Sequence, residues 1–573
     1  MKTIWGETLD AHNVLQEYPR PQLQRESYLN LNGIWKYAIT ADDTEPVLYD
    51  GDIIVPFSPE SVLSGVHRQL FPSETLWYRK EVMLPEGFHH PGNRLILHFG
   101  AVDNETTVFI NEMEITHHEG GYLPFSLELS SLLEPGANGF SLKLLVHDPT
   151  DTSYHTRGKQ KTRRGGIWYT PQSGIWQTVW MESVPQNAVD ELKIEPLFDD
   201  SAVALTVFSA ADADCTVTLG ETSHILRTNS REIIPLANSI PWSPESPHLH
   251  PFSIELGDDR VTSYFAMRKF SVETDSAGVR RLFLNGRPYF HNGVLDQGYW
   301  SDGLYTPPSD DAMIYDIQTM KDLGFNMLRK HIKVEPLRWY YHCDRLGMLV
   351  WQDIVNGGGT YSLLTISSPL ITGIHFKDDK YRWFARQNAE GRKEFMEELG
   401  AMVRHLFNCP CIAMWVPFNE GWGQFDAAKA VDLIRSLDSS RTIDHASGWH
   451  DQKIGEFKSL HVYFKPYRFK ADKLGRAVIL TEFGGYSYPV AGHCYNTKDF
   501  GYKKLTSPTA LFEQYRKLYE EQVIPAKTKG LAATVYTQLS DVEDEVNGFL
   551  TYDRKVLKLP VEETGSIVSR LND

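Results

Sequence analysis

The chain has 573 residues, enough for about three to four domains of roughly 150 residues each. Its apolar content of 41% and charged content of 23% are those of a folded globular protein, which excludes a disordered, collagen-like or coiled-coil chain. Because 57 basic residues face 74 acidic ones, the net charge is −17, and the chain lacks the basic surface that nucleic acids and anionic membranes attract.

The first third of the chain has the short strands of a two-sheet β domain. Apolar residues alternate over 95–99, and a second apolar run covers 107–110. Such runs, cut by Gly, Pro, Asn and Asp, predict a jelly roll over residues 1–183. A Gly-Ile-Trp sequence occurs twice within it, ending at Trp168 and at Trp176. We expect both indoles to pack in the core or along a strand edge.

The next segment, 184–270, keeps the β pattern but is more polar. Short strands are predicted at 202–208, 215–219 and 224–227. A length of roughly 85 residues suits an immunoglobulin-like sandwich of about seven strands.

From residue 271 onward, helical periodicity alternates with short buried runs. In the first predicted helix, Ser309 stands at the N-cap position and Gly324 ends the apolar pattern. Eight strand–helix repeats predict a (β/α)8 barrel over 271–573, with an open doubly wound sheet as the alternative. No Gly-x-Gly-x-x-Gly follows a strand to favour that alternative. The eight strands are expected at 289–295, 325–328, 348–351, 412–418, 442–445, 460–464, 477–481 and 531–536.

Two glutamates follow strands of this predicted barrel, at the strand ends where barrel enzymes carry their chemistry. Glu420 follows the apolar strand 412–418 after one intervening residue, Asn419, and Glu482 follows the strand 477–481. Burying a carboxylate there costs free energy unless it pairs with a cation or takes part in the chemistry of the site. Either glutamate alone could form a structural ion pair, but two on one rim match the carboxylate pair of glycoside hydrolysis.

Motifs in all three predicted domains agree with this interpretation. Besides Asn419-Glu420, they are Leu-Asn-Gly-Ile-Trp at 31–35, Trp-Tyr-Arg at 77–79, Phe-Ala-Met-Arg-Lys at 265–269 and Leu-Thr-Glu-Phe-Gly at 480–484. Over essentially its whole length the chain resembles glycoside hydrolase family 2. The resemblance implies hydrolysis with retention, Glu420 acting as acid/base and Glu482 as nucleophile.

Further rim residues are expected to bind the substrate. The resemblance implies that Asn419 bonds the sugar 2-hydroxyl, that Tyr463 contacts the nucleophile, and that Tyr536 replaces a more usual tryptophan. Ordinary hydrogen bonding along the rim is the alternative for several of them, and ring packing is the alternative for Trp449. The complete set of expected substrate contacts is Asp296, His331, Asn419, Trp449, His461, Tyr463 and Tyr536.

The sequence leaves the sugar open. A retaining exo-β-glycosidase of β-galactosidase type is the main prediction, with a β-glucuronidase, a β-galacturonidase or another family specificity as the alternative. A non-catalytic carbohydrate-binding protein is disfavoured because both glutamates are present. Asn496-Thr497-Lys498 has the Asn-x-Lys form that β-glucuronidases use for a carboxylate. It begins only 14 positions after Glu482 (496 − 482), which is closer than in the family's motif. Lys330 and Lys333 could also meet a uronate, although exposed lysines at a helix start are commoner.

Two charged segments receive ordinary interpretations. The acidic run at 541–545 is expected to be a solvated loop, and the basic run at 159–164 an isolated loop of an acidic protein.

Cysteine use and hydropathy indicate where the protein works. Five scattered cysteines make no disulfide framework and no zinc spacing, so neither a metal nor a cofactor is expected. No apolar leader and no run of 18 apolar residues occur. We therefore expect a soluble, cytoplasmic protein that acts on a carbohydrate and binds no nucleic acid or membrane; assembly into a homo-oligomer stays open.

Overall fold

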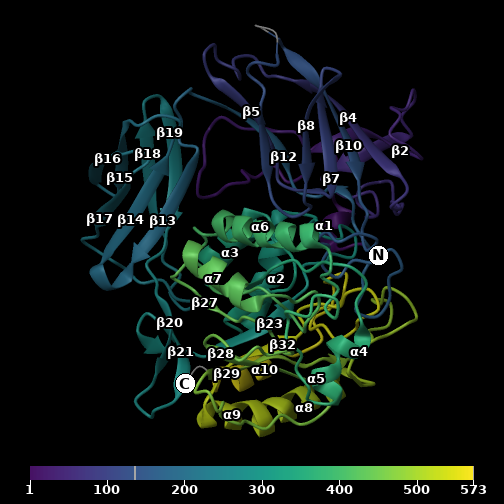
Figure 1. Cartoon of the computed structure of the whole chain (residues 1–573), viewed down its shortest axis with the longest axis vertical. Coiled ribbons are helices and arrows are strands. Elements are labelled where there is room, and N and C mark those ends of the chain that lie inside the picture. Colours follow the sequence, from purple (N-terminus) through teal and green to yellow (C-terminus); the bar gives the residue numbers. More distant parts are fainter. Residues whose placement is uncertain (134–136, 572–573) are drawn as a thin grey trace.

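The computed structural model describes residues 1–133 and 137–571. Two β domains lie side by side on one side of a larger α/β domain (Figure 1). None of the described helices combines the length and apolarity needed to cross a membrane.

The first domain is built from two antiparallel sheets. One has the strand order β1-β12-β5-β9 and the other β3-β2-β4-β10-β7-β8, while β6 pairs with β11. Leu95, Leu97 and Phe99, which alternate along β5, are fully buried between the sheets, as the alternation predicted. The strands are β1 Leu29–Asn30, β2 Gly33–Thr40, β3 Gly51–Val55, β4 Thr75–Met83, β5 Arg94–Phe99, β6 Val102–Asp103, β7 Glu105–Ile110, β8 Met113–Glu119, β9 Phe125–Glu128, β10 Gly139–His147, β11 Gly174–Ile175 and β12 Val179–Val184.

The second domain is a sandwich of a three-stranded sheet, β13-β14-β17, and a four-stranded sheet, β16-β15-β18-β19. Its core is one apolar cluster that includes Leu205, Val217 and Ile254. A three-stranded antiparallel sheet, β20-β21-β22, then leads into the last domain. The strands are β13 Glu191–Leu197, β14 Ala202–Phe208, β15 Asp214–Leu219, β16 Thr222–Arg227, β17 Arg231–Pro235, β18 His250–Leu256, β19 Asp259–Phe265, β20 Phe270–Thr274, β21 Arg280–Leu284 and β22 Arg287–Pro288.

The last domain is an eight-stranded parallel sheet curled into a barrel, in the order β27-β26-β25-β24-β23-β32-β29-β28. The predicted multidomain fold class is therefore confirmed. Helix α2 begins as expected, because the Ser309 side chain accepts from the backbone N–H of Ala312 at 3.1 Å. The barrel strands are β23 His291–Asp296, β24 Met327–Lys330, β25 Leu349–Asp353, β26 Ile412–Val416, β27 Thr442–Ile443, β28 Phe457–Val462, β29 Ala477–Gly484 and β32 Leu531–Thr537. The main helices are α2 Asp310–Asp322, α3 Leu337–Leu346, α6 Ala389–His405, α7 Ala427–Leu437, α8 Pro508–Leu518, α9 Ile524–Lys529 and α10 Val561–Ser569.

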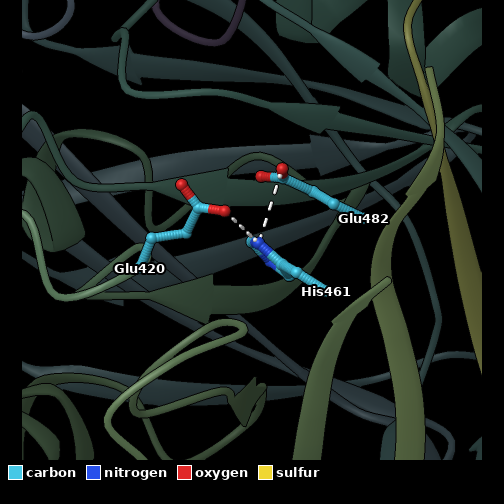
Figure 2. A group of neighbouring side chains, drawn as sticks. All are labelled: Glu420, His461 and Glu482. Atoms are coloured by element: carbon cyan, nitrogen blue, oxygen red, sulfur yellow. Dashed lines mark hydrogen bonds and ion pairs between the residues drawn. The ribbon is translucent and has the colours of Figure 1, made fainter. Parts of the chain in front are cut away.

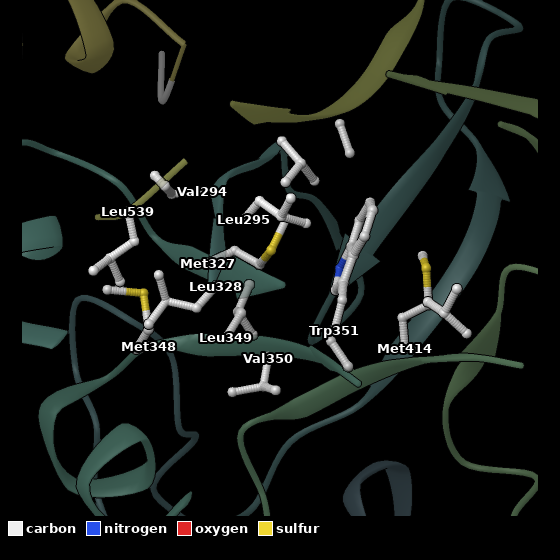
Figure 3. Close-up of a cluster of buried hydrophobic side chains, with 14 of the residues drawn as sticks. Val294, Leu295, Met327, Leu328, Met348, Leu349, Val350, Trp351, Met414 and Leu539 are labelled. Carbon is white, nitrogen blue, oxygen red and sulfur yellow. The ribbon is translucent and has the colours of Figure 1, made fainter. Parts of the chain in front are cut away.

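Apolar side chains fill the barrel and the layer between strands and helices. Figure 3 shows Val294, Leu328, Val350 and Trp351 within this cluster, and all of them are buried. Burying one such side chain contributes about 1.5–3 kcal/mol. Since the interior is packed with apolar groups, polar side chains gather where the strands end.

A loop of the first domain, residues 154–170, reaches the barrel. The backbone N–H groups of Arg157 and Gly158 both donate to the carbonyl of Asn356, at 2.9 and 3.0 Å. Gly158 has φ +63°, and a Cβ there would lie 3.2 Å from the carbonyl oxygen of Ile332. Only glycine combines that backbone angle with so close an approach. The first domain is therefore anchored beside the ends of β24 and β25.

Candidate active site

The two glutamates come from neighbouring parts of the barrel rim. Glu482 lies within β29, while Glu420 follows β26 in a left-handed conformation, with φ 52°. Non-glycine residues rarely adopt this conformation, which costs free energy and occurs often at functional sites. The backbone N–H of Glu420 donates to the carbonyl of Ser447 at 2.9 Å, which fixes the strained turn.

The carboxylates of Glu420 and Glu482 face each other across His461 (Figure 2). His461 Nδ1 lies 2.7 Å from Glu420 Oε1 and 3.4 Å from Glu482 Oε2. One oxygen of each carboxylate and a ring nitrogen of His461 all lie within 4.8 Å of one another. Carboxyl groups about 5–5.5 Å apart are typical of retaining glycosidases, whereas inversion needs roughly 6.5–9.5 Å to admit a water.

Glu482 is held by a hydroxyl and a guanidinium. Tyr463 donates its Oη hydrogen to Oε2, and Arg329 Nη1 lies 3.3 Å from Oε1. Burial and the charge of Glu482 raise the pKa of Tyr463 well above its usual range, so Tyr463 keeps the proton that it donates. Arg329 is fully buried and also forms a bidentate pair with Asp353, at 3.0 Å on each side. These contacts orient the Glu482 carboxylate towards Glu420.

Glu420 has a different environment. Burial raises its pKa, but the hydrogen bond from His461 and the charge of Lys159 outweigh burial and leave the pKa below its ordinary value. Trp422 Nε1 also donates to Glu420 Oε2, at 3.2 Å. Two carboxylates alone would raise the pKa of Glu420 through the charge of Glu482. The structure differs because the His461 ring nitrogen lies against both carboxylates. Protonation of Glu420 weakens the hydrogen bond from His461, because a neutral carboxyl is a weaker acceptor than a carboxylate.

Asn419 and His331 complete this side of the rim. Asn419 Oδ1 accepts from Arg329 Nη2 at 2.9 Å, while its amide nitrogen makes no hydrogen bond with any residue that the structure describes. That nitrogen can therefore donate to a ligand. Burial, with the charges of Lys159 and Arg329, holds the pKa of His331 well below its usual value, so the ring is neutral. Its Nδ1 lies 2.6 Å from Asp353 Oδ2, which leaves Nε2 as an acceptor.

Aromatic rings flank the site on the Glu420 side. Trp422, which bonds Glu420, meets Trp168 and Tyr361 edge to face, each at a ring-centroid distance of 5.2 Å. Trp449 belongs to the same apolar cluster, lies 6.3 Å from the His461 ring and is partly exposed. One Gly-Ile-Trp element therefore ends at the site with Trp168, whereas its twin ends in the core with Trp176, which is 1% exposed.

Family comparison agrees with this geometry. The model described as "Glycosyl hydrolases family 2, TIM barrel domain" matches residues 279–547, and the family 2 sugar binding domain matches residues 66–185. The chain belongs to glycoside hydrolase family 2. This confirms the family resemblance drawn from the sequence.

Individual relatives are distant. A β-glucuronidase of Canis lupus familiaris is 23% identical over 70% of this family 2 chain and 65% of its own length. A β-galactosidase of Thermoanaerobacter pseudethanolicus is 20% identical over 81% of this chain and 62% of its own length. The chain thus spans a little under two thirds of these relatives. A solved β-glucuronidase of Ruminococcus gnavus superposes with a TM-score of 0.75, 16% identity and coverage of 98% and 99% of the two chains. Most of the named relatives are β-glucuronidases.

Of the expected substrate contacts, Tyr536 faces away from the glutamates, and Asp296 is engaged by a neighbouring lysine. Tyr536 is 1% exposed and stacks on Phe549 at a centroid distance of 4.6 Å, so its ring is closed to a sugar. Side chains alternate along a strand, and it is Thr537 whose Oγ1 lies 2.9 Å from Tyr463 Oη. Asp296 is buried in an ion pair with Lys330, at 2.6 Å. The expectation for Tyr536 was therefore wrong, whereas the substrate contact expected of Asp296 stays a prediction.

The lysines of the second strand end are not exposed, contrary to expectation. Lys330 is 1% exposed and donates to Asp296 and Glu335, at 2.6 and 2.8 Å. Lys333 is fully buried and donates to Glu335 and to the carbonyls of Gly298 and Tyr305. Lys330 also lies 4.1 Å from the centre of the Trp339 ring, so protein groups enclose both ammonium groups and neither lysine is available to a uronate.

The acidic run at 541–545 is buried rather than solvated, because it meets the first-domain loop. Arg164 Nη1 lies 3.0 Å from Asp544 Oδ1 and 3.5 Å from Glu543 Oε2. Tyr169 donates its hydroxyl hydrogen to Glu545. The two charged segments that we interpreted as separate loops thus form one interface, which we call the loop clasp (residues 159–170 with 541–545).

The clasp brings a residue to the site that the sequence analysis missed. Lys159 is partly buried, and its ammonium lies 5.9 Å from the centre of the Tyr169 ring. Its charge acts on Glu420, Asp353 and Glu545. The signal available in the sequence was the basic run in an otherwise acidic chain.

Glu420, His461 and Glu482 could also offer three ligand atoms to a metal ion. An ion there would have to replace the hydrogen bond between His461 and Glu420. Binding of a metal would thus compete with the contacts described above.

Proposed function

We propose that this protein is a retaining exo-β-glycosidase in which Glu482 is the nucleophile and Glu420 the acid/base. The observation that carries the proposal is the approach of the two carboxylates to within 4.8 Å, with Glu482 held by Tyr463 and Arg329. A non-catalytic sugar-binding protein would have no need of a strained, buried carboxylate pair.

The reaction proceeds in two displacements. Glu482 attacks the anomeric carbon while Glu420 gives its proton to the glycosidic oxygen, the bond to the aglycone breaks, and a glycosyl ester forms. The charge of Glu482 is then lost, and Glu420, now ionised, removes a proton from an incoming water. The water oxygen bonds the anomeric carbon, the ester breaks, and the sugar leaves with its original configuration.

For the sugar, a β-linked hexuronic acid is favoured over galactose. The named relatives support this choice, because most of them are β-glucuronidases and one is a β-galactosidase. The main prediction from the sequence, a β-galactosidase type, has less support.

A panel of 4-nitrophenyl β-glycosides tests the proposal: glucuronide, galacturonide, galactoside, glucoside and mannoside. We expect hydrolysis of at least one substrate, with the β-anomer as the first product in a proton NMR time course. Release of the α-anomer would exclude the double displacement. Absence of hydrolysis across the whole panel would reject the glycosidase itself.

A further inference from the structure

We infer that Lys159, which the first domain supplies, binds the substrate's carboxylate and so selects hexuronides over neutral sugars. The inference rests on the proposed function and assigns its specificity to one residue outside the barrel.

The loop around Lys159 is fixed on both sides. On one side, Gly158 lies against Ile332, the residue after His331, and the Arg157 guanidinium donates to the Gly358 carbonyl. On the other side, the Tyr169 N–H donates to the carbonyl of Lys159 itself, at 2.9 Å. Contacts on both sides pre-organise the lysine, so little conformational entropy is lost when an anion binds.

The ammonium of Lys159 is not occupied by the protein. It makes no hydrogen bond or ion pair with any residue of the described ranges, 1–133 and 137–571. A partly buried ammonium that lies near the Tyr169 ring but donates no hydrogen bond is available to a negatively charged ligand. A hexuronate provides one carboxylate, carried by C5, which the ring oxygen separates from the anomeric carbon.

The need for such a cation follows from the charges already in the pocket. Glu420, Glu482 and Glu545 lie around it, so the extra charge of a uronate would be repelled without a counter-charge. Arg329 cannot serve, because Asp353, Glu482 and Asn419 engage its guanidinium. Lys333 donates all three of its hydrogens to protein acceptors, and Lys330 is enclosed by two acceptors and the Trp339 ring, 4.1 Å away.

The Asn-x-Lys sequence of the barrel does not take this role. Asn496 donates its amide hydrogen to Asp544 at 2.6 Å, and Lys498 is exposed at the surface. The interface that engages Asn496 is the same loop clasp that carries Lys159.

The test compares Lys159→Met and Lys159→Arg with Arg163→Met, a charge removal at an exposed position of the same loop. For each variant, kcat/KM is measured on 4-nitrophenyl β-glucuronide, β-galacturonide, β-glucoside and β-galactoside. We expect Lys159→Met to lower the ratio of uronide to neutral kcat/KM by roughly 100-fold, as for a lost charged contact. Lys159→Arg should recover part of this ratio, and Arg163→Met should keep it. Free glucuronic or galacturonic acid should inhibit wild type competitively and Lys159→Met more weakly.

Two outcomes would overturn the inference while leaving the glycosidase intact. One is a wild-type enzyme that hydrolyses neutral glycosides and not uronides. The other is an equal loss on both classes in Lys159→Met, which would mean that Lys159 acts only through the charge of Glu420. Hydrolysis of no glycoside at all would instead reject the proposed function, and the inference with it.

Discussion

The barrel rim and the first-domain loop both place residues at the site, but different interactions position them. The rim places Glu420 and Glu482 at the ends of buried parallel strands, where their position follows from strand order alone. The loop places Lys159 and Trp168 there through contacts with residues more than 170 positions away along the chain. The rim thus carries the proposed chemistry, and the loop the proposed choice of substrate.

If the rim carries the chemistry, Glu482→Gln should have the largest effect of any single change. The amide keeps the shape of the side chain but cannot attack the anomeric carbon. We expect kcat to fall by roughly 10⁴-fold or more on every glycoside, as for loss of a catalytic nucleophile. The measurement is initial rate on the best substrate, with circular dichroism as the control for folding. Activity near the wild-type level would remove Glu482 from the mechanism.

Glu420→Ala should separate the two roles of the rim. Loss of a general acid costs about 10²–10⁴-fold where the leaving group needs a proton, and far less for an activated aryl group. We therefore expect 4-nitrophenyl glycosides to release nitrophenol in a burst, followed by slow turnover that azide accelerates. The azide product should have the β configuration. Equal losses on activated and unactivated substrates, without azide rescue, would contradict the acid/base role.

The sequence could predict the rim because burial and strand order are local patterns. Strand 412–418 is continuously apolar, so Asn419 and Glu420, the two residues that follow it, had to lie at its end. Tyr536 shows the limit of that reasoning, since a shift of one position along β32 exchanges the site-facing side for the helix-facing side. The loop clasp could not be predicted, because its ion pairs join positions 379 and 380 residues apart. Contacts over such a separation leave no periodic pattern in the sequence.

Weakening the clasp should affect the loop and leave the rim in place. In Arg164→Met, Glu543 and Asp544 lose their cation, and Lys159 is held less firmly. Because the Arg164 side chain is about a third exposed, the cost is closer to 1 kcal/mol than to that of a fully buried pair. We expect kcat/KM for uronides to fall by about tenfold, chiefly through KM, with a smaller change on neutral glycosides.

Arg68→Met is the matched control, since Arg68 pairs with Glu74 inside the first domain. A fall in kcat of the same size on all substrates in Arg164→Met would mean that the clasp supports the rim itself, and the comparison between rim and loop would fail.

The smallest effect is expected from His461, and it concerns pH more than rate. Burial raises the pKa of Glu420, while the hydrogen bond from His461 is the largest of the effects that lower it. In His461→Ala that bond is lost, so the pKa of Glu420 rises and Glu420 stays protonated to higher pH. The alkaline limb of kcat/KM reports the acid of the free enzyme, and we expect it to move to higher pH. The rate at the optimum should fall by about tenfold or less, as for one lost hydrogen bond. Ser447→Ala is the control, because it removes the contact at the other ring nitrogen, 3.1 Å from the Ser447 hydroxyl, and the bond from that hydroxyl to Thr481, but keeps the bond between His461 and Glu420. Ser447→Ala should leave the pH of the alkaline limb of kcat/KM unchanged. An alkaline limb that stays in place or moves to lower pH in His461→Ala would show that another group sets the protonation of the acid.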